Sequence, residues 1–357
     1  MSNKIIVSVT NDLSTDQRVH KVCTTLLDMG FDVHLVGFLK NNSKKLNRNY
    51  STYRFKMLFS KGPLFYLEYS LKLFTYLLFN KSNYLLSNDL DTLLPNFLIA
   101  KIKSKKIIFD AHEIFSESPE LLNRPNVKKV WHLLETFLLP KVDYSYTVCN
   151  LLAKFYHEKY AVEMSVVRNV PFLTNYSTTT SNQKILIFQG NYNKGRGLEL
   201  AVEGLEFLPD FKLIIVGGGF DHLKKIAKSK NVLDQIQFVG EVPFEKLKMY
   251  TSKASIGLLL EQPIGLSFSY SLPNKLFDYI HSDLKFIASP LLEVKNIVEK
   301  YSIGMLLEDR CPQKFAKQIK ELYQQKINPT LYTKAKEELN WQNEEKVLKT
   351  IFEKVRK

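Results

Sequence analysis

Cysteine is scarce in this sequence, and long apolar runs are missing. Only Cys23, Cys149 and Cys311 occur among 357 residues, and their odd number and wide spacing argue against a disulfide framework or a metal-binding pair. No apolar run approaches the roughly 18 residues that cross a bilayer. The first residues also lack the apolar core and cleavage site of a signal peptide. We therefore expect reduced thiols in a cytoplasmic protein.

Acidic residues are absent from Val33 to Leu67, whereas the same stretch contains seven Lys and Arg residues. The whole chain has a net charge of +14, a balance that attracts nucleic acid, anionic lipid or anionic small molecules. An aromatic-rich segment, Pro63–Lys81, directly follows the basic segment Lys40–Lys61. One interpretation is a surface that docks on an anionic membrane. The other is a solvated loop followed by an ordinary core helix.

Short β-branched segments alternate with longer helical ones, which predicts parallel sheets covered by helices. The alternation stops once, at the polar segment Phe172–Gln183, and then restarts. The length also suggests about two domains. We therefore expect an α/β protein of two Rossmann-like, doubly wound domains that face each other across a cleft. The expected bounds are 1–175 for the N-terminal domain, 176–342 for the C-terminal domain and 343–357 for a final helix, which stays on the second domain or crosses back to the first.

In open α/β sheets, ligands bind beyond the carboxyl ends of the strands, so the residues that follow each strand are the candidates for a site. The expected strands are Lys4–Thr10, Asp32–Phe38, Tyr53–Leu58, Tyr84–Ser87, Lys106–Asp110, Tyr144–Val148 and Ser165–Arg168 in the first domain, and Lys184–Gly190, Phe211–Gly219, Ile236–Gly240, Ala254–Leu260 and Lys285–Ser289 in the second.

Asn11 and Asp12 follow the first strand and precede a helix, so backbone amides there could face an anion. A helix capped by Ser14 or Thr15, without a ligand, is at least as good an explanation.

Asp89 and Asp91 follow the fourth strand, and His112 and Glu113 follow the fifth. Two carboxylates alone are a weak metal signal, so we expect no metal and favour contact with a hydroxylated ligand or a helix start. His112 is a candidate for phosphate binding or proton transfer near neutral pH, with a structural loop histidine as the alternative.

The segment "FQGNYNKGRGLELA" runs from strand through loop to helix in the second domain. Gly190 and the two later glycines allow the backbone to approach a ligand closely, and Lys194 and Arg196 add positive charge before a helix. These features together predict a phosphate site, with a solvated basic turn as the alternative. Gly240 ends a later strand.

The segment "SLPNKLFDYI" begins a helix whose polar face contains Asn274 and Asp278. At about 100° per residue these two lie opposite the apolar residues Leu276, Phe277 and Ile280. The polar face is either exposed to water only or part of a ligand site.

Seven stretches, in order along nearly the whole chain, resemble the retaining glycosyltransferases of family 4, of the bacterial surface-polysaccharide type, which have the GT-B fold. The matching stretches are "VSVTNDLSTDQRVHKVCTTL", "FDAHE", "VVRNVP", "FQGNYNKGRGLELAVEGL", "LIIVGGG", "FVGEVP" and "SLPNKLFDYIHSDLKFIAS". The resemblance implies a nucleotide diphosphate sugar as donor, held mainly by the C-terminal domain. It also implies transfer with retention, without a required metal or cofactor.

The resemblance assigns roles to individual residues. In the family a basic pair holds the diphosphate, and its two positions are Asn191 and Arg196 here, with Lys194 as a substitute cation. Asp278 matches the acidic residue that binds the donor ribose, whereas Tyr270 stands where the family has a second Glu. His112 matches a histidine placed near the transferred sugar.

No separate nucleophile is apparent in the sequence, so we prefer front-face substitution, in which Arg196 and Lys194 stabilise the departing diphosphate. The acceptor would be a glycan or a lipid-linked glycan. Two alternatives stay open: a nucleotide-sugar epimerase on the same architecture, and a basic nucleic-acid-binding protein. We favour no nucleic-acid partner, because the sequence has no recognisable nucleic-acid-binding motif.

Overall fold

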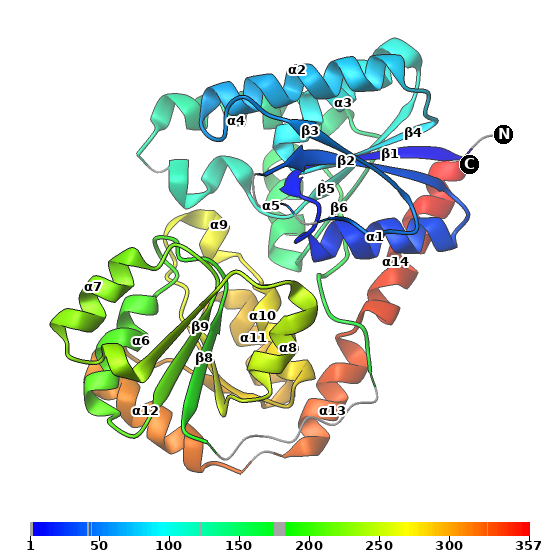
Figure 1. Cartoon of the computed structure of the whole chain (residues 1–357). Helices are drawn as coiled ribbons and strands as arrows, with labels where there is room; N and C mark the ends of the chain where they lie inside the picture. The colour runs from blue at the N-terminus through cyan, green and yellow to red at the C-terminus, as the bar shows by residue number, and fades with distance from the viewer. Residues whose placement is uncertain (1–2, 41–42, 44, 122, 175–182, 327) are drawn as a thin grey trace. The chain divides into compact units, whose positions relative to one another are not determined.

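The computed structural model describes residues 3–40, 43, 45–121, 123–174, 183–326 and 328–357. It divides into two compact units, Met1–Asn169 together with Glu344–Lys357, and Val170–Asn343 (Figure 1). The domain boundary predicted between residues 175 and 176 lies outside the described residues. None of the described helices is both long and apolar enough to cross a membrane.

The first unit is built on a seven-stranded parallel sheet in the order β3-β2-β1-β4-β5-β6-β7. The strands are β1 (Lys4–Asp12), β2 (Asp32–Leu39), β3 (Ser51–Lys56), β4 (Tyr84–Asn88), β5 (Lys106–Ala111), β6 (Tyr144–Thr147) and β7 (Ser165–Val166). The central strands are buried on both faces, as their near-continuous apolar runs require.

Helices cover both faces of this sheet. They are α1 (Gln17–Asp28), α2 (Pro63–Phe79), α3 (Leu90–Lys103), α4 (Pro125–Leu138), α5 (Asn150–Tyr160) and α14 (Trp341–Arg356), with short 3₁₀ turns at Phe115–Glu117, Pro119–Leu121 and Leu139–Lys141. Figure 1 shows α2, α3 and α4 above the sheet and α1 and α14 below it. The ring of Phe352 on α14 lies 5.7 Å from that of Phe31, and Arg356 donates to the Met29 carbonyl at the end of α1.

The N-cap of α1 differs from the sequence-based alternatives. Asp16, rather than Ser14 or Thr15, caps the helix, because its carboxylate accepts a hydrogen bond of 3.0 Å from the Val19 amide.

The second unit contains a six-stranded parallel sheet in the order β10-β9-β8-β11-β12-β13. Its strands are β8 (Ile185–Gln189), β9 (Lys212–Val216), β10 (Ile236–Gly240), β11 (Ile256–Leu259), β12 (Lys285–Ala288) and β13 (Met305–Leu306). Its helices are α6 (Leu198–Gly204), α7 (Asp221–Ser229), α8 (Phe244–Thr251), α9 (Gly265–Ser269), α10 (Asn274–His281), α11 (Leu292–Tyr301), α12 (Pro312–Gln324) and α13 (Pro329–Glu338), with short 3₁₀ turns at Leu205–Phe207 and Leu233–Gln235.

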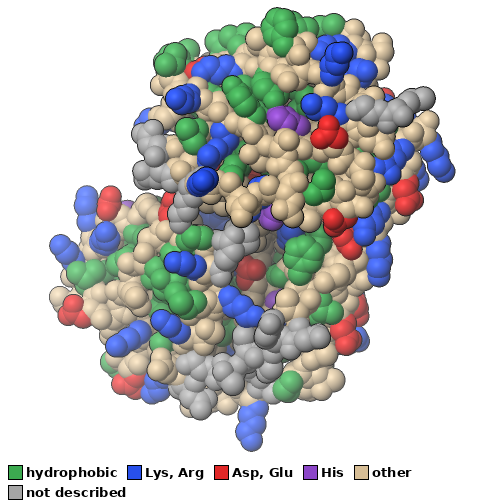
Figure 2. Space-filling view, turned by 45° about the vertical axis from the view of Figure 1, so that its right-hand side comes forward, with side chains coloured by type: hydrophobic (Ala, Val, Ile, Leu, Met, Phe, Trp, Pro, Cys, Tyr) green, Lys and Arg blue, Asp and Glu red, His purple; other side chains and the backbone are tan. Residues whose placement is uncertain are grey.

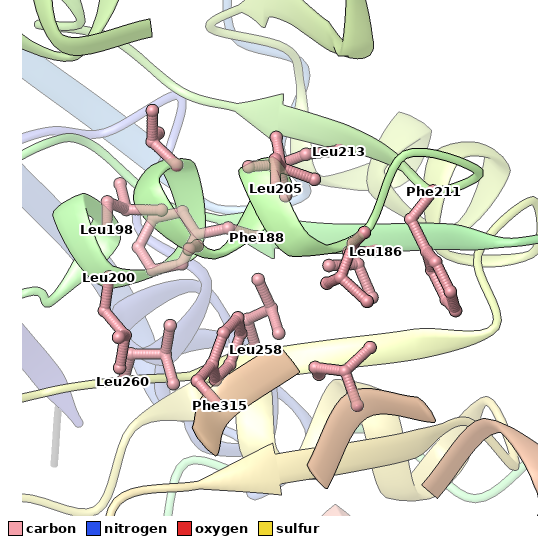
Figure 3. Close-up of a cluster of buried hydrophobic side chains, with 14 of the residues drawn as sticks. Leu186, Phe188, Leu198, Leu200, Leu205, Phe211, Leu213, Leu258, Leu260 and Phe315 are labelled. Atoms are coloured by element: carbon pink, nitrogen blue, oxygen red, sulfur yellow. The ribbon is translucent and has the colours of Figure 1, made fainter. Parts of the chain in front are cut away.

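One face of this second sheet is sealed by a dense apolar core. Side chains from β8, β9 and β11, including Phe188 and Leu258, point toward Leu205, which directly follows α6, and toward Phe315 of α12 (Figure 3). All four of these side chains are fully buried. This packing fixes the loops at the carboxyl ends of the strands, where ligands bind in such sheets.

The predicted fold of two doubly wound α/β domains is confirmed. Every predicted strand is present, with small differences at the ends. The two-residue strand β13 was not predicted, and the long loop expected before α10 contains the short helix α9.

Candidate functional site

Each sheet has one point at which the strand order reverses direction. In the first unit it lies between β1 and β4, and in the second between β8 and β11. Crevices beyond the carboxyl ends of the strands at such points are where open α/β sheets bind ligands. The predicted site residues fall largely on the loops at these two places, so each unit has its own candidate site.

In the first unit, two carboxylates hold His112. The Nδ1 atom lies 3.1 Å from Asp89 Oδ2, the Nε2 atom lies 3.1 Å from Asp110 Oδ2, and the backbone amide of His112 donates to Asp89 Oδ1 at 2.8 Å. Asp110 in turn accepts from the buried guanidinium of Arg18, at 2.7 Å from Nη2 and 2.9 Å from Nε. Strands β4 and β5 therefore bring Asp89 and His112 together, as their neighbouring positions in the sheet require.

The charge state of His112 follows from these contacts. Burial alone would lower the pKa of His112, but Asp89 and Asp110 raise it well above the ordinary value. Burial would likewise raise the pKa of Asp110, yet Arg18 and His112 lower it to about 2. His112 is therefore an imidazolium at neutral pH with both nitrogens facing carboxylates, which suits a fixed donor or cation better than a general base.

Asp91 behaves differently from its neighbours. It lies in the first turn of α3, is 9% exposed and accepts a hydrogen bond from Thr10 on β1. Burial and the nearby charge of Asp89 raise its pKa to about 8, so Asp91 is mostly protonated at neutral pH. Its Oδ1 atom is buried without a hydrogen-bond partner among the described residues. Glu113 follows His112 and is half-buried.

Asn11 and Asp12 shape the loop after β1. The amide of Asn11 donates to Asp16 Oδ2 at 2.8 Å. Asp12 is buried and accepts from the Ser14 amide and hydroxyl and from the Ser43 hydroxyl. Although burial opposes it, these hydrogen bonds lower the pKa of Asp12. The structure thus gives Asp12 a role in holding the loop.

In the second unit, the loop after β8 is tightly constrained. Gly195 and Gly197 have φ values of +87° and +70°, and a Cβ on Gly197 would lie 1.9 Å from the Leu260 carbonyl oxygen. The Gly195 carbonyl accepts from the Gln262 amide at 2.7 Å. Asn191, at the position expected for an arginine, accepts from the Gly218 amide at 2.8 Å and so joins the loops after β8 and β9. Gly190 begins this loop, with φ at +128°.

Arg196 belongs to a cluster that sequence reasoning missed. Its Nη1 atom lies 3.4 Å from Glu261 Oε1, and the same oxygen lies 2.6 Å from Lys275 Nζ. Glu261 follows β11, and Lys275 is in the first turn of α10. Lys194, by contrast, is exposed and forms no ion pair with any residue that the structure describes. The spacing along α10 offered one signal, since Lys275 lies one helical turn before the aromatic Tyr279, and both side chains are buried.

The remaining predicted donor residues lie around α9 and α10. Asn274 is exposed, and Asp278 is half-buried on the polar face of α10. Tyr270 ends α9 and lines a cavity of about 430 Å³ with residues that follow β12 and β13, among them Leu291 and Arg310. Gly240 has φ at +82° and open space around its Cα. Among the described residues, no three His, Cys, Asp or Glu side chains gather as a metal ion would need.

Comparison with solved structures decides the fold. Sucrose-phosphate synthase (tll1590) from Thermosynechococcus elongatus superposes with a TM-score of 0.76 at 13% identity, covering 99% of this chain and 98% of that one. Anabaena Alr3699/HepE in complex with UDP-glucose gives 0.73 at 13% identity, covering 97% and 99%. The fold is GT-B.

A third GT-B relative is relevant to the choice of function. UDP-GlcNAc 2-epimerase from Methanocaldococcus jannaschii superposes with a TM-score of 0.60 at 13% identity, covering 98% and 99%. In sequence, residues 175–339 match the family described as "Glycosyl transferases group 1". No curated protein matches the chain. The family match is confined to residues 175–339, and the solved structures, each 13% identical, show the fold.

Proposed function

We propose that this GT-B protein transfers a sugar from a nucleotide diphosphate sugar to a glycan or lipid-linked acceptor, in cell-surface polysaccharide biosynthesis. The observation that carries the proposal is the group of cations at the β8/β11 reversal, inside the segment that matches the group 1 glycosyl transferases. Arg196 and Lys275 pair with the carboxylate of Glu261, and Arg310 donates to the backbone carbonyl of the same residue, in a tightly constrained glycine-containing loop region. A surplus of positive charge beside backbone amides suits a diphosphate.

The proposed donor contacts follow from this arrangement. Arg196 and the exposed Lys194 bind the diphosphate, and Asp278 binds the ribose from α10. UDP is the first nucleotide to test, because the HepE structure was determined in complex with UDP-glucose. Tyr270 stands where the family has a glutamate near the donor sugar, so the proposal names the nucleotide diphosphate and not the sugar.

The proposed chemistry is front-face transfer with retention at the anomeric carbon, without a required metal or cofactor. Negative charge develops on the departing diphosphate, and Arg196 stabilises it. The leaving phosphate accepts the proton of the acceptor hydroxyl as the new glycosidic bond forms. His112, an imidazolium fixed by Asp89 and Asp110, is proposed as a fixed cation near the transferred sugar rather than as a base.

An apolar and basic face on the first unit supports a membrane-bound acceptor. The exposed residues Leu64, Leu67, Leu71 and Leu78 form one stripe along α2, opposite the buried stripe of that helix. Helix α3 packs on α2, where Lys103 donates to the Leu78 carbonyl, and α4 adds exposed Leu133 and Phe137. Figure 2 shows hydrophobic and basic side chains together at the top of the view, over α2.

The charge of this face has one sign. From residue 45 to residue 141, every exposed charged side chain that the structure describes is a Lys or Arg. Apolar side chains surrounded by cations fit the surface of an anionic bilayer. We therefore propose a cytoplasmic protein that associates peripherally with the inner face of the plasma membrane, where it meets a lipid-linked acceptor.

Co-sedimentation with vesicles tests the membrane part. Binding to phosphatidylcholine vesicles that contain phosphatidylglycerol should exceed binding to pure phosphatidylcholine and should fall with salt. The double variant Leu67→Gln/Leu71→Gln should lose this binding. The control Met249→Gln/Leu292→Gln, which changes two exposed apolar residues of the second unit, should keep it. Equal binding to both vesicle types would refute the proposal.

Thermal shift with UDP and UDP-sugars tests the donor part, because a ligand of the folded state raises its stability. Arg196→Ala should abolish the shift, whereas the control Lys225→Ala, an exposed cation on α7, should leave it. If a UDP-sugar without an acceptor accumulates its C2 epimer, the protein is an epimerase instead. A salt-sensitive RNA or DNA shift without nucleotide binding would indicate a nucleic-acid-binding protein.

A further inference from the structure

Glu261 is shared by two cations of very different exposure. Its Oε1 atom lies 2.6 Å from Lys275 Nζ and 3.4 Å from Arg196 Nη1. The side chains of Glu261 and Lys275 are 3% and 6% exposed, whereas that of Arg196 is 35% exposed. Lys275 Nζ also lies 3.7 Å above the ring of Phe188, so the core closes over it from β8. Of these three charged groups, only Arg196 reaches the surface.

The backbone that carries Glu261 is fixed separately. Arg310 Nη2 donates to the Leu260 carbonyl at 3.1 Å, to the Glu261 carbonyl at 2.9 Å and to Ser289 Oγ at 2.7 Å. On the other side, the Arg196 Nε atom is buried without a hydrogen-bond partner among the described residues. Arg310 thus holds the backbone of Glu261 in place. Arg196, which pairs with the Glu261 carboxylate, still has one N–H group available to donate.

A buried ion pair is seldom needed for stability, because apolar residues of similar volume serve as well or better. Its presence directly behind an exposed arginine therefore calls for another role. A lone Glu261 would draw the guanidinium of Arg196 inward and neutralise it. With Lys275 on the same oxygen, the three-residue group has a net charge of one cation, and that charge is presented by Arg196.

We propose that Lys275 and Glu261 are positioning residues for a nucleoside diphosphate: Glu261 orients Arg196, and Lys275 compensates Glu261 so that Arg196 stays available to the diphosphate. This inference rests on the proposed donor site but assigns two residues that the family resemblance did not point to. It predicts a specific dependence of diphosphate binding on pH and on paired substitutions.

The pH dependence follows from the surroundings of Lys275. The ionisable groups near it are Glu261 after β11, Arg196 on the β8–α6 loop and Tyr279 on its own helix, while Arg310 and Glu199 act on the cluster from farther away. Burial and repulsion from Arg196 outweigh the attraction of Glu261 and lower the pKa of Lys275 to about 8. Lys275 is charged below that pH and loses its charge above it. UDP affinity should therefore fall as the pH rises through 8.

Titration calorimetry with UDP and with uridine tests the inference. Lys275→Met should weaken UDP binding by roughly tenfold or more, the size expected for a lost charge-assisted contact. Uridine binding should change little, because it lacks the diphosphate. Lys275→Arg should retain UDP affinity above pH 8, where the native protein loses it. Comparing the variant with the native protein at each pH removes the effect of the titration of UDP itself.

A paired substitution separates positioning from simple structural damage. Lys275→Met/Glu261→Gln removes both charges, and the substituted amide oxygen can still accept from Arg196 without neutralising it. The double variant should therefore regain most of the UDP affinity that Lys275→Met loses. Melting temperatures show whether each variant is folded. If Lys275→Met does not fold, the pH dependence of UDP binding to Lys275→Arg is the test instead. Equal losses for UDP and uridine, or no recovery in a folded double variant, would overturn the inference. If the native protein binds no nucleotide, the donor proposal itself has failed.

Discussion

At the scale of single residues, two buried aspartates of the first unit have opposite charge states. Asp110 is buried and ionised, because Arg18 and His112 lie against it. Asp91 is buried and mostly neutral, because burial and the charge of Asp89 raise its pKa more than the Thr10 hydrogen bond and His112 lower it. The charge state depends on the groups around each carboxyl. Arg18 and Thr10, which contact Asp110 and Asp91, both come from distant parts of the sequence.

Asp91→Asn should make stability less dependent on pH. Between pH 4 and pH 8 the unfolded chain has released the Asp91 proton while the folded protein retains it, so rising pH favours unfolding. The loss is at most about 1.4 kcal/mol per pH unit. Urea denaturation at pH 5 and pH 8 should show a smaller decrease for Asp91→Asn than for the native protein. The exposed Asp210 offers a matched control as Asp210→Asn, and an unchanged pH slope in Asp91→Asn would contradict the prediction.

Arg18→Met should strongly destabilise the protein. It would leave Asp110, which is fully buried, without its bidentate cation, and such uncompensated buried charges cost about 3–5 kcal/mol. His112 alone would then face both Asp110 and Asp89. Chemical denaturation measures the effect, with the exposed Arg124→Met for comparison. A loss below about 1 kcal/mol would show that Arg18 is not the main counterion.

At the scale of elements, the sequence predicted strands well because their apolar runs are local features. Each predicted strand corresponds to a strand of the structure, and the family-like segments lie at strand ends as expected. The two-residue β13 has too few residues to give a pattern. The Glu261–Lys275 pair was missed because fourteen residues separate its members, and only the packing of α10 against β8 and β11 brings them together.

The candidate site was predictable to a smaller extent than the strands. Asp89 and His112 were named from their positions after neighbouring strands, and the structure brings them together. Asn191 was named for a ligand role, which stays a prediction, and its side chain joins two loops by accepting from the Gly218 amide. Whether a polar side chain faces a ligand or its own backbone depends on loop geometry, which spacing along the chain does not encode.

Gly197→Ala should damage the loop after β8 far more than Gly240→Ala. Both glycines have positive φ, so each substitution costs about 1 kcal/mol in backbone strain. Only at Gly197 would the new Cβ also collide with the Leu260 carbonyl, whereas Gly240 has open space. Urea denaturation should show the larger loss for Gly197→Ala, together with weaker UDP binding because Arg196 is its neighbour. Similar losses for both variants would contradict the geometry.

At the scale of the whole molecule, stability is divided between two cores. Each unit has its own parallel sheet and its own buried side chains, and α14 supplies Phe352 to the first unit after the chain has completed the second. Multi-domain chains of this kind commonly unfold in more than one step. The proposed contacts to the nucleotide, from Lys194, Arg196 and Asp278, all lie in the second unit, so UDP binding should be reported by that unit's transition alone.

Calorimetric unfolding should therefore show two transitions that respond to different perturbations. Phe352→Ala should lower one and Phe315→Ala the other, because both rings are fully buried, one in each unit, and such truncations cost about 3–5 kcal/mol. Saturating UDP should raise only the transition that Phe315→Ala lowers, since a ligand stabilises the structure that binds it. If UDP raised the Phe352-sensitive transition instead, the nucleotide would bind the first unit. One transition that both variants lower equally would show that the two units unfold as one.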